Sequence, residues 1–437
     1  MPCFKAPQHT SQAVSRVDQA GFFPVVTCWK QRRYEDFTGL ACYLLCMEPE
    51  SGKILEGWIG CVWRHATTAT GPEDTMRDAR YIPSGCAIVG IMSEEGRLFD
   101  GSMVMDSIAN MHFRGNGLGG GFSAYGIYPE QKDHYAFHMM FDAPAGRERA
   151  EEVLARYFVA RFDERIPTRR VSAIKNRPTL WRYFVTVKEE VKEEYYDFTE
   201  EDIVVKAVME INRTIEDAFV TSSGKNMGVF KGVGYPEDIG EFFKLESYKA
   251  YQWTAHGRFP TNTSAWWGGA HPFGLLDWTI VHNGEISSYG INRRYLSNFG
   301  YECYMQTDTE VITYLFDLLV RKHRLPIDIA AKVLAAPLWT QIETRPDAER
   351  QMLEAFRMTY GGALLNGPFS VVLGSGKMMV GLNDRIKLRP MVAARDKDLV
   401  FIASEEAAIR TVCRNPEKVW SIKAGEPVIA VLKEKAA

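Results

Sequence analysis

The chain has 437 residues, of which 46 % are apolar and 24 % charged, and its formal net charge is −3. This mix is typical of a globular protein with a substantial core, and the length allows two or three domains. The small net charge argues against nucleic acid or an anionic membrane as a partner. No apolar run reaches the roughly 18 residues of a membrane span. Residues 1–20 lack the apolar core of a signal peptide, so we expect a cytoplasmic protein.

The first block, residues 1–85, holds five of the eight cysteines. Eight cysteines are too few for a disulfide scaffold in a chain this long, so free thiols are expected. An alternative is a zinc or iron–sulfur cluster site formed by Cys28, Cys42, Cys46 and Cys61. They lack the closely spaced pairs typical of such sites, so we predict no metal. The polar residues 66–80 predict a linker or exposed loop.

The second block begins at Cys86. Residues 86–92 form a short apolar run bounded by turn signals, which predicts a buried strand. Met103, Ile108 and Met111 follow at helical spacings and predict a helix over residues 100–113. Glycine and asparagine within residues 114–117 can adopt positive φ and are expected to end this helix.

The middle of the chain, residues 130–246, predicts an inserted subdomain. Thr199 and Asp202 have the spacing of a capping box, and an apolar helical stripe follows from Val204 to Ile215. Another helix is predicted over residues 146–158. The predicted strands cover residues 135–142, 180–188, 219–221 and 227–230. The order strand–helix–strand, strand–helix–strand suggests a ferredoxin-like insert.

The third block, from residue 251 to the end, alternates short apolar strands with turns. The helix predicted over residues 308–323 has one apolar face. The strands are predicted over residues 278–282, 369–374, 377–382 and 399–403. Strand-rich segments with a few helices indicate a layered α+β domain.

Four short segments carry the candidate chemistry. They are residues 84–90 (SGCAIVG), 255–262 (AHGRFPTN), 281–286 (VHNGEI) and 306–310 (QTDTE). In this order they resemble the class II glutamine amidotransferases, which are N-terminal-nucleophile (Ntn) hydrolases. Residues 382–390 and 403–405 fit the same family. The resemblance implies a layered αββα domain over residues 86–435, interrupted by the insert and preceded by an extension, residues 1–85.

The resemblance makes Cys86 the nucleophile, attacking the glutamine amide to form a thioester. A free cysteine has a pKa of about 8.5 and needs a base. In Ntn enzymes the base is the nucleophile's own α-amino group, which requires that nothing precede it. Cleavage between Gly85 and Cys86 is therefore expected, and retention of the extension would remove this base. Alone, Cys86 would be read as a small buried residue. Ala87 departs from the family, which usually has glycine there.

Asn283 and Gly284 are the oxyanion hole that the resemblance implies. The asparagine amide and the glycine N–H can both point toward a developing negative charge. The alternative is a hairpin turn, since Asn-Gly is a strong turn dipeptide after an apolar strand.

The resemblance also assigns the residues that bind glutamine. Arg258 would bind the α-carboxylate through its planar guanidinium, and Asp308 the α-ammonium. A surface ion pair for Arg258 and a helix N-terminal acid for Asp308 are the alternatives. The pocket would be lined by Phe259, Thr261 and Asn262, and Arg114 would support the nucleophile.

Within the family the chain looks most like the separate amidotransferase subunit of split glutamate synthases. Residues 116–129, 258–263 and 282–286 carry this likeness. It implies no cofactor in this chain and a glutamate synthase partner that binds FMN and an iron–sulfur cluster. The partner would use the ammonia to aminate 2-oxoglutarate. An Ntn hydrolase of another small amide and a non-catalytic interaction subunit remain as alternatives.

Overall fold

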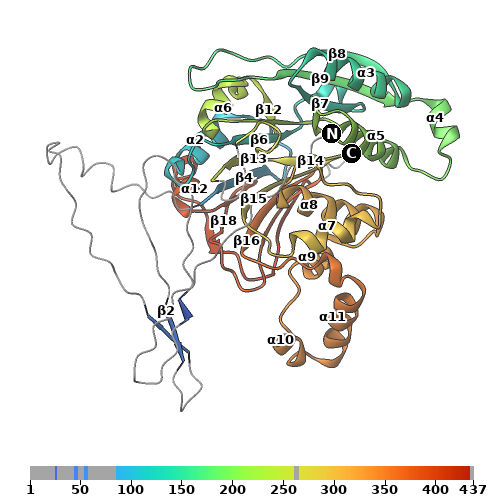
Figure 1. Cartoon of the computed structure of the whole chain (residues 1–437). Helices are drawn as coiled ribbons and strands as arrows, with labels where there is room; N and C mark the ends of the chain where they lie inside the picture. The colour runs from blue at the N-terminus through green and yellow to red at the C-terminus, as the bar shows by residue number, and fades with distance from the viewer. Residues whose placement is uncertain (1–24, 27–43, 48–53, 58–84, 260–264, 434–437) are drawn as a thin grey trace. The chain divides into compact units, whose positions relative to one another are not determined.

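The computed structural model describes residues 25–26, 44–47, 54–57, 85–259 and 265–433 (Figure 1). The chain divides into two units, residues 1–79 and 80–437. In the first unit, β1 (Val25–Val26), β2 (Leu44–Met47) and β3 (Ile54–Gly57) form an antiparallel sheet in the order β1-β2-β3. Free thiols were predicted for the cysteines of this block, but their side chains lie outside the described residues.

A seven-stranded sheet dominates the second unit, in the order β11-β6-β13-β4-β19-β18-β20. Its strands are β4 (Ala87–Ser93), β6 (Gly120–Tyr125), β11 (Met227–Gly232), β13 (Gln252–Gly257), β18 (Val392–Asp396), β19 (Leu399–Ala403) and β20 (Lys418–Ser421). The central strand β4 is buried at every position, which explains its unbroken apolar sequence. The strand predicted over residues 86–92 is therefore present.

A five-stranded antiparallel sheet faces it, in the order β14-β15-β16-β17-β21. Its strands are β14 (Phe273–Leu275), β15 (Trp278–Gly284), β16 (Phe369–Gly374), β17 (Met378–Asn383) and β21 (Val428–Val431). The two sheets pack closely, because a Cβ on Gly90 of β4 would lie 2.6 Å from the Met379 sulfur and 2.8 Å from Val372. The alternate residues of β4, Val89 and Ile91, face the opposite way and join the core beneath α2.

Helices cover the outer faces of both sheets. On the seven-stranded sheet lie α2 (Ser102–Ala109), α6 (Pro236–Phe242) and α12 (Glu406–Val412). On the five-stranded sheet lies α8 (Asp308–Phe316), which packs against α7 (Tyr289–Ser297) and continues into a π-helical turn, Asp317–Lys322. Beyond them α9 (Ile327–Leu334), α10 (Trp339–Glu343) and α11 (Asp347–Thr359) form a helical projection (Figure 1). The result is a mixed, four-layer arrangement of helix, sheet, sheet and helix.

The insert has its own sheet in the antiparallel order β10-β7-β9-β8. Its elements are β7 (Tyr135–Phe141), α3 (Pro144–Tyr157), β8 (Phe158–Arg165), β9 (Thr179–Val187), α4 (Glu189–Glu194), α5 (Glu200–Thr214) and β10 (Ala218–Ser222). The capping box is present: the Asp202 N–H donates to Thr199 Oγ1 at 3.2 Å, and the Thr199 N–H donates to Asp202 Oδ2 at 3.3 Å. Strand β8 was not predicted, because its residues are largely exposed and do not alternate between apolar and polar.

Two boundaries differ from the predictions. Strand β11 was assigned to the insert, yet it pairs with β6 in the seven-stranded sheet, and α6 packs on that sheet. The local pattern of β11 specifies a buried strand but not its partner. The helix predicted over residues 100–113 ends at Ala109, and a separate 3-10 turn covers His112–Arg114.

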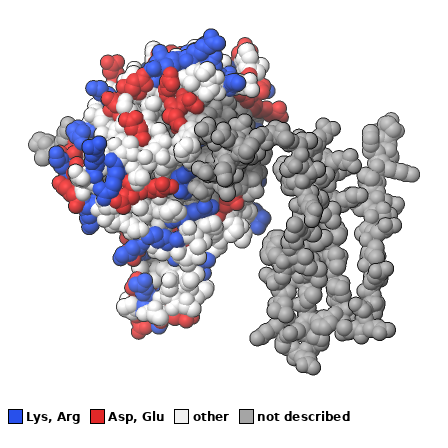
Figure 2. Space-filling view, turned by 90° about the vertical axis from the view of Figure 1, so that its left-hand side faces the viewer, with Lys and Arg blue, Asp and Glu red and all other residues white. Residues whose placement is uncertain are grey.

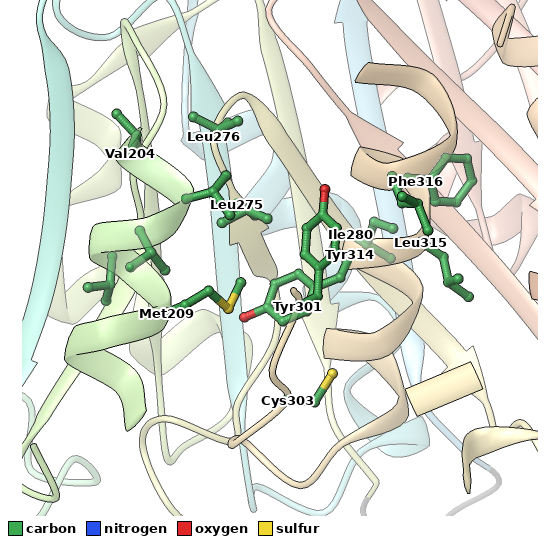
Figure 3. Close-up of a cluster of buried hydrophobic side chains, with 14 of the residues drawn as sticks. Val204, Met209, Leu275, Leu276, Ile280, Tyr301, Cys303, Tyr314, Leu315 and Phe316 are labelled. Atoms are coloured by element: carbon green, nitrogen blue, oxygen red, sulfur yellow. The ribbon is translucent and has the colours of Figure 1, made fainter. Parts of the chain in front are cut away.

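The insert shares a hydrophobic core with the five-stranded sheet. Val204 and Met209 of α5 face Leu275, Leu276 and residues of α8 (Figure 3). On the face shown in Figure 2, acidic and basic side chains lie beside one another. In the part of the chain that the structure describes, no helix is both long and apolar enough to cross a membrane.

Candidate active site

Cys86 lies immediately before β4, the central strand of the seven-stranded sheet. Its Sγ accepts a hydrogen bond from the Phe259 backbone N–H at 3.3 Å. The Arg114 Nε donates to the Cys86 carbonyl oxygen at 3.1 Å, and Arg114 Nη1 forms an ion pair with Glu405 at 2.7 Å. The candidate nucleophile is therefore held at its sulfur by Phe259 and at its main chain by Arg114.

The electrostatic environment of the Cys86 thiol is mixed. Burial raises its pKa, and Asp308 adds to this increase. The Phe259 N–H and the positive charges of Arg258 and Arg389 act in the opposite direction without cancelling the effect of burial. The thiol is consequently protonated at neutral pH and requires a base before it can attack.

Gly85 precedes Cys86 with a φ of +131°, a conformation that favours glycine. A Cβ at this position would lie 3.6 Å from Arg389 Nη1, 3.7 Å from Asn283 Oδ1 and 3.9 Å from Arg114 Nη2. Two guanidinium groups and one amide therefore lie close to Gly85, the residue before the candidate nucleophile. Positive charges near an amine released at Cys86 would lower its pKa.

Asn283 and Gly284 end strand β15 and pair with Ser370 and Phe369 of β16. The hairpin-turn alternative is therefore wrong, because the two residues belong to a continuous ladder. Asn283 is 1 % exposed, and its Oδ1 and Nδ2 have no hydrogen-bond partner among the described residues. Gly284 has a φ of +150°, and a Cβ there would lie 2.0 Å from the Pro368 carbonyl oxygen. Only glycine fits this position.

Arg258 directly follows β13, and its backbone N–H donates to the Gly119 carbonyl at 2.8 Å. Arg258 is only 5 % exposed, so the alternative of a surface ion pair is wrong. Burial lowers the pKa of its guanidinium, while Cys86 and Asp308 oppose that change. A buried guanidinium close to the thiol can bind the carboxylate of a small substrate.

Asp308 is the first residue of α8, so it is also the helix N-terminal acid that the sequence allowed. Its Oδ2 accepts from the Ile286 N–H at 3.2 Å, and its Oδ1 lies 3.4 Å from His282 Nδ1. Burial favours the neutral carboxyl, but His282 and these hydrogen bonds hold the pKa of Asp308 below its ordinary value. Asp308 is therefore an anion at neutral pH and can bind an ammonium group.

A buried lysine and a buried glutamate lie near the site, since the charge of Arg258 acts on Lys231 and Glu310 follows Asp308 in α8. Lys231 of β11 is 2 % exposed and donates from Nζ to the Gly268 carbonyl at 2.9 Å. Glu310 of α8 accepts from the backbone N–H of Tyr304 at 3.1 Å. Burial lowers the pKa of Lys231 to about 7 and raises that of Glu310 to about 7, and each charge partly counteracts the shift of the other.

The structure thus brings together Cys86, Arg114, Arg258, Phe259, Asn283, Gly284 and Asp308. Thr261 and Asn262 lie outside the described residues. No role was predicted for Arg389, Glu405 or His282, although they lie in the segments 382–390, 403–405 and 281–286 that resemble the family. Among the described residues, no three histidine, cysteine or acidic side chains converge as a metal site.

Much of the sequence is similar to that of known proteins. A family model described as class II glutamine amidotransferases matches residues 90–427. A protein of Archaeoglobus fulgidus, described as uncharacterized, is 51 % identical over 354 residues, which are 80 % of this chain and 93 % of that protein. The NADPH glutamate synthase large chain of Bacillus subtilis is 26 % identical over 216 residues, 44 % of this chain and 14 % of that one.

Among solved structures, the B. subtilis glutamine phosphoribosylpyrophosphate amidotransferase, complexed with ADP and GMP, matches with 15 % identity and a TM-score of 0.39. That match covers 79 % of this chain and 47 % of the solved one, so this chain spans about half its length. The family match over residues 90–427 covers most of the sequence, and the chain therefore belongs to the class II glutamine amidotransferases.

Proposed function

We propose that this chain hydrolyses glutamine to glutamate and ammonia through a thioester on Cys86. The observation that carries the proposal is the position of the Cys86 sulfur. It lies 3.3 Å from the Phe259 N–H, at the strand end that faces Asn283 and within the fields of Arg258 and Asp308. A nucleophile, amide donors and two opposite charges at one place fit an α-amino acid that carries an amide.

The proposed base is the α-amine of Cys86, freed by cleavage after Gly85. This amine takes the thiol proton while sulfur attacks the side-chain carbonyl carbon of glutamine. The carbon–nitrogen bond then breaks, and the same proton leaves on ammonia. Water, deprotonated by the amine, hydrolyses the thioester and releases glutamate and the thiol. Arg114 and Arg389 beside the amine support its neutral form at neutral pH.

Three further roles complete the proposal. Asn283 and the Gly284 N–H stabilise the negative oxygen of the tetrahedral intermediate, where one such donor typically contributes roughly 3–4 kcal/mol. Arg258 binds the α-carboxylate of glutamine and Asp308 its α-ammonium. Phe259, Thr261 and Asn262 line the pocket.

The acceptor of the ammonia is proposed to lie on a partner. The likeness of residues 116–129 and 258–263 to glutamate synthases, together with the match to a glutamate synthase large chain, supports a synthase subunit with FMN and an iron–sulfur cluster. This chain would then be its cytoplasmic amidotransferase subunit. Its domain would span residues 86–435 after an extension of residues 1–85. The strand order β10-β7-β9-β8 supports a ferredoxin-like insert.

A glutaminase assay on purified chain tests the proposal. Wild-type protein is expected to release equal amounts of glutamate and ammonia from glutamine, and Cys86→Ala to release neither. Equal ammonia release by both proteins would remove Cys86 from the chemistry. Hydrolysis of other small amides but not glutamine would favour the alternative amidohydrolase. No hydrolysis by a chain that begins at Cys86, with or without the synthase partner, would favour a non-catalytic subunit.

A further inference from the structure

Three polar side chains form a row across the five-stranded sheet. Asn283 of β15 is directly opposite Ser370 of β16, and Ser370 is directly opposite Asn383 of β17. Side chains at opposed positions of adjacent strands point to the same face and lie within reach of one another, with Cβ atoms about 4.5–5.5 Å apart. Each of the three residues is at most 1 % exposed.

This row lies on the inner face of the sheet, next to apolar side chains. Two residues further along the strands, Val281 and Val372 occupy the same face and join a core that includes Ile88 of the opposite sheet. Polar groups in such a layer are costly unless they are hydrogen-bonded, roughly 1–3 kcal/mol each. Stability therefore gives no reason for a serine beside Asn283.

The known hydrogen bond of Asn383 determines which groups of the row can donate and which can accept. Asn383 Nδ2 donates to the Ile422 carbonyl at 3.3 Å, which leaves Asn383 Oδ1 as an acceptor toward Ser370. Asn383 Oδ1, Ser370 Oγ and both polar atoms of Asn283 have no partner within hydrogen-bond distance among the described residues. Rotation of these side chains, or one shared water, can join them. The Ser370 hydroxyl then donates to Asn383 and accepts from the Asn283 NH2 group.

This order of donors and acceptors determines the orientation of the Asn283 amide, because its NH2 group must point toward Ser370. With the three side chains joined in this way, one of the two Asn283 N–H groups would bind Ser370, and the other would remain for the negative oxygen of an intermediate on Cys86. Its Oδ1 lies close to Gly85, 3.7 Å from where a Cβ on that residue would be. An α-amine formed at Cys86 can donate to this oxygen. A flipped amide would present a second oxygen to the negative charge and abolish its stabilisation.

We propose that Ser370, held by Asn383, is a positioning residue that fixes the orientation of the Asn283 amide. The proposal rests on the glutaminase function proposed above, because Ser370 acts through Asn283 on the intermediate. It assigns a role to a residue outside the four segments that carry the candidate chemistry.

The test is a double-mutant cycle on glutamine hydrolysis. Ser370→Ala is expected to lower kcat about tenfold, less than the 10²–10³-fold typical for loss of an oxyanion donor, with KM for glutamine unchanged within twofold. In an Asn283→Ala background the same change should have no further effect on kcat. Ser370→Thr, which keeps the hydroxyl, should restore most of the activity. An equal loss in both backgrounds, or an unchanged kcat for Ser370→Ala, would overturn the proposal.

Ser123→Ala is the matched control, because Ser123 is also a buried hydroxyl between the sheets. It bonds Thr254 Oγ1 at 2.7 Å and Thr279 Oγ1 at 2.8 Å, away from Cys86. This variant should lose thermal stability but keep kcat. The same double-mutant cycle is also measured by thermal unfolding. The Tm of wild type, the Ser370 and Asn283 single variants and the double variant can be compared without any catalytic activity. Non-additive shifts support the row and additive shifts overturn it, even if Cys86→Ala shows that the glutaminase proposal fails.

Discussion

Replacement of Gly284 by alanine probes the proposed oxyanion hole with a single methyl group. The Cβ would lie 2.0 Å from the Pro368 carbonyl oxygen and 2.8 Å from Phe369 Cα, and both are backbone atoms that cannot rotate away. The first distance is short of ordinary van der Waals contact by about 1.4 Å, so the end of β15 must move by a comparable amount. The φ of +150° adds strain of roughly 1–3 kcal/mol.

Movement of this size takes the Gly284 N–H out of hydrogen-bonding range of the intermediate. Loss of one such donor typically costs about 2.7–4 kcal/mol in the transition state, so kcat for glutamine hydrolysis should fall 10²–10³-fold. The measurement is glutamate release under saturating glutamine, together with thermal unfolding of the same protein.

Gly300→Ala is the matched control. Gly300 has a φ of +81°, and nothing lies within 4 Å of the added methyl group. This variant should carry the backbone strain alone, lose about 1 kcal/mol of stability and keep its kcat. The role of the Gly284 N–H would be refuted if Gly284→Ala retained a kcat within threefold of Gly300→Ala.

Three further predictions concern stability. Between pH 7 and 10.5 the unfolded chain binds more protons at Lys231 than the folded chain, so stability should rise with pH, and Lys231→Met should flatten this slope in urea unfolding. Between pH 4.5 and 7 the folded chain binds more at Glu310, so stability should fall with rising pH, and an unchanged slope in Glu310→Gln would contradict the assignment. Thr199→Ala removes the capping box of α5 and should cost about 1 kcal/mol of unfolding free energy. Its kcat should remain that of wild type, and a lower kcat would show that the insert influences the site.

Local sequence patterns predicted the elements whose character is set by their own residues. The apolar run after Cys86 gave β4, and the Thr199 spacing gave the start of α5. Strand β8 escaped because it is an exposed edge strand without alternation. Strand β11 was recognised as a strand, but its pairing with β6 depends on residues more than a hundred positions away, which local periodicity does not reveal.

The candidate site divides in the same way. Family motifs placed Cys86, Arg258, Asn283 and Asp308 in advance, and the structure brings them together. Residues that act through these four were not predictable from spacing, because the fold alone makes them neighbours. Ser370 is one such residue, since it lies 87 positions from Asn283 and becomes its neighbour only in the β15–β16 ladder. Glu405 is similar: only the fold places it at the guanidinium of Arg114.

The central claim is that Cys86 acts with its own free α-amine, and one measurement tests it most directly. Active protein is treated with a glutamine analogue that has a diazoketone in place of the side-chain amide, and the labelled chain is analysed by intact-mass and peptide mass spectrometry. We predict a single label on a chain whose first residue is Cys86. Active, labelled protein that still begins at Met1, or a label on any other residue, would contradict the claim.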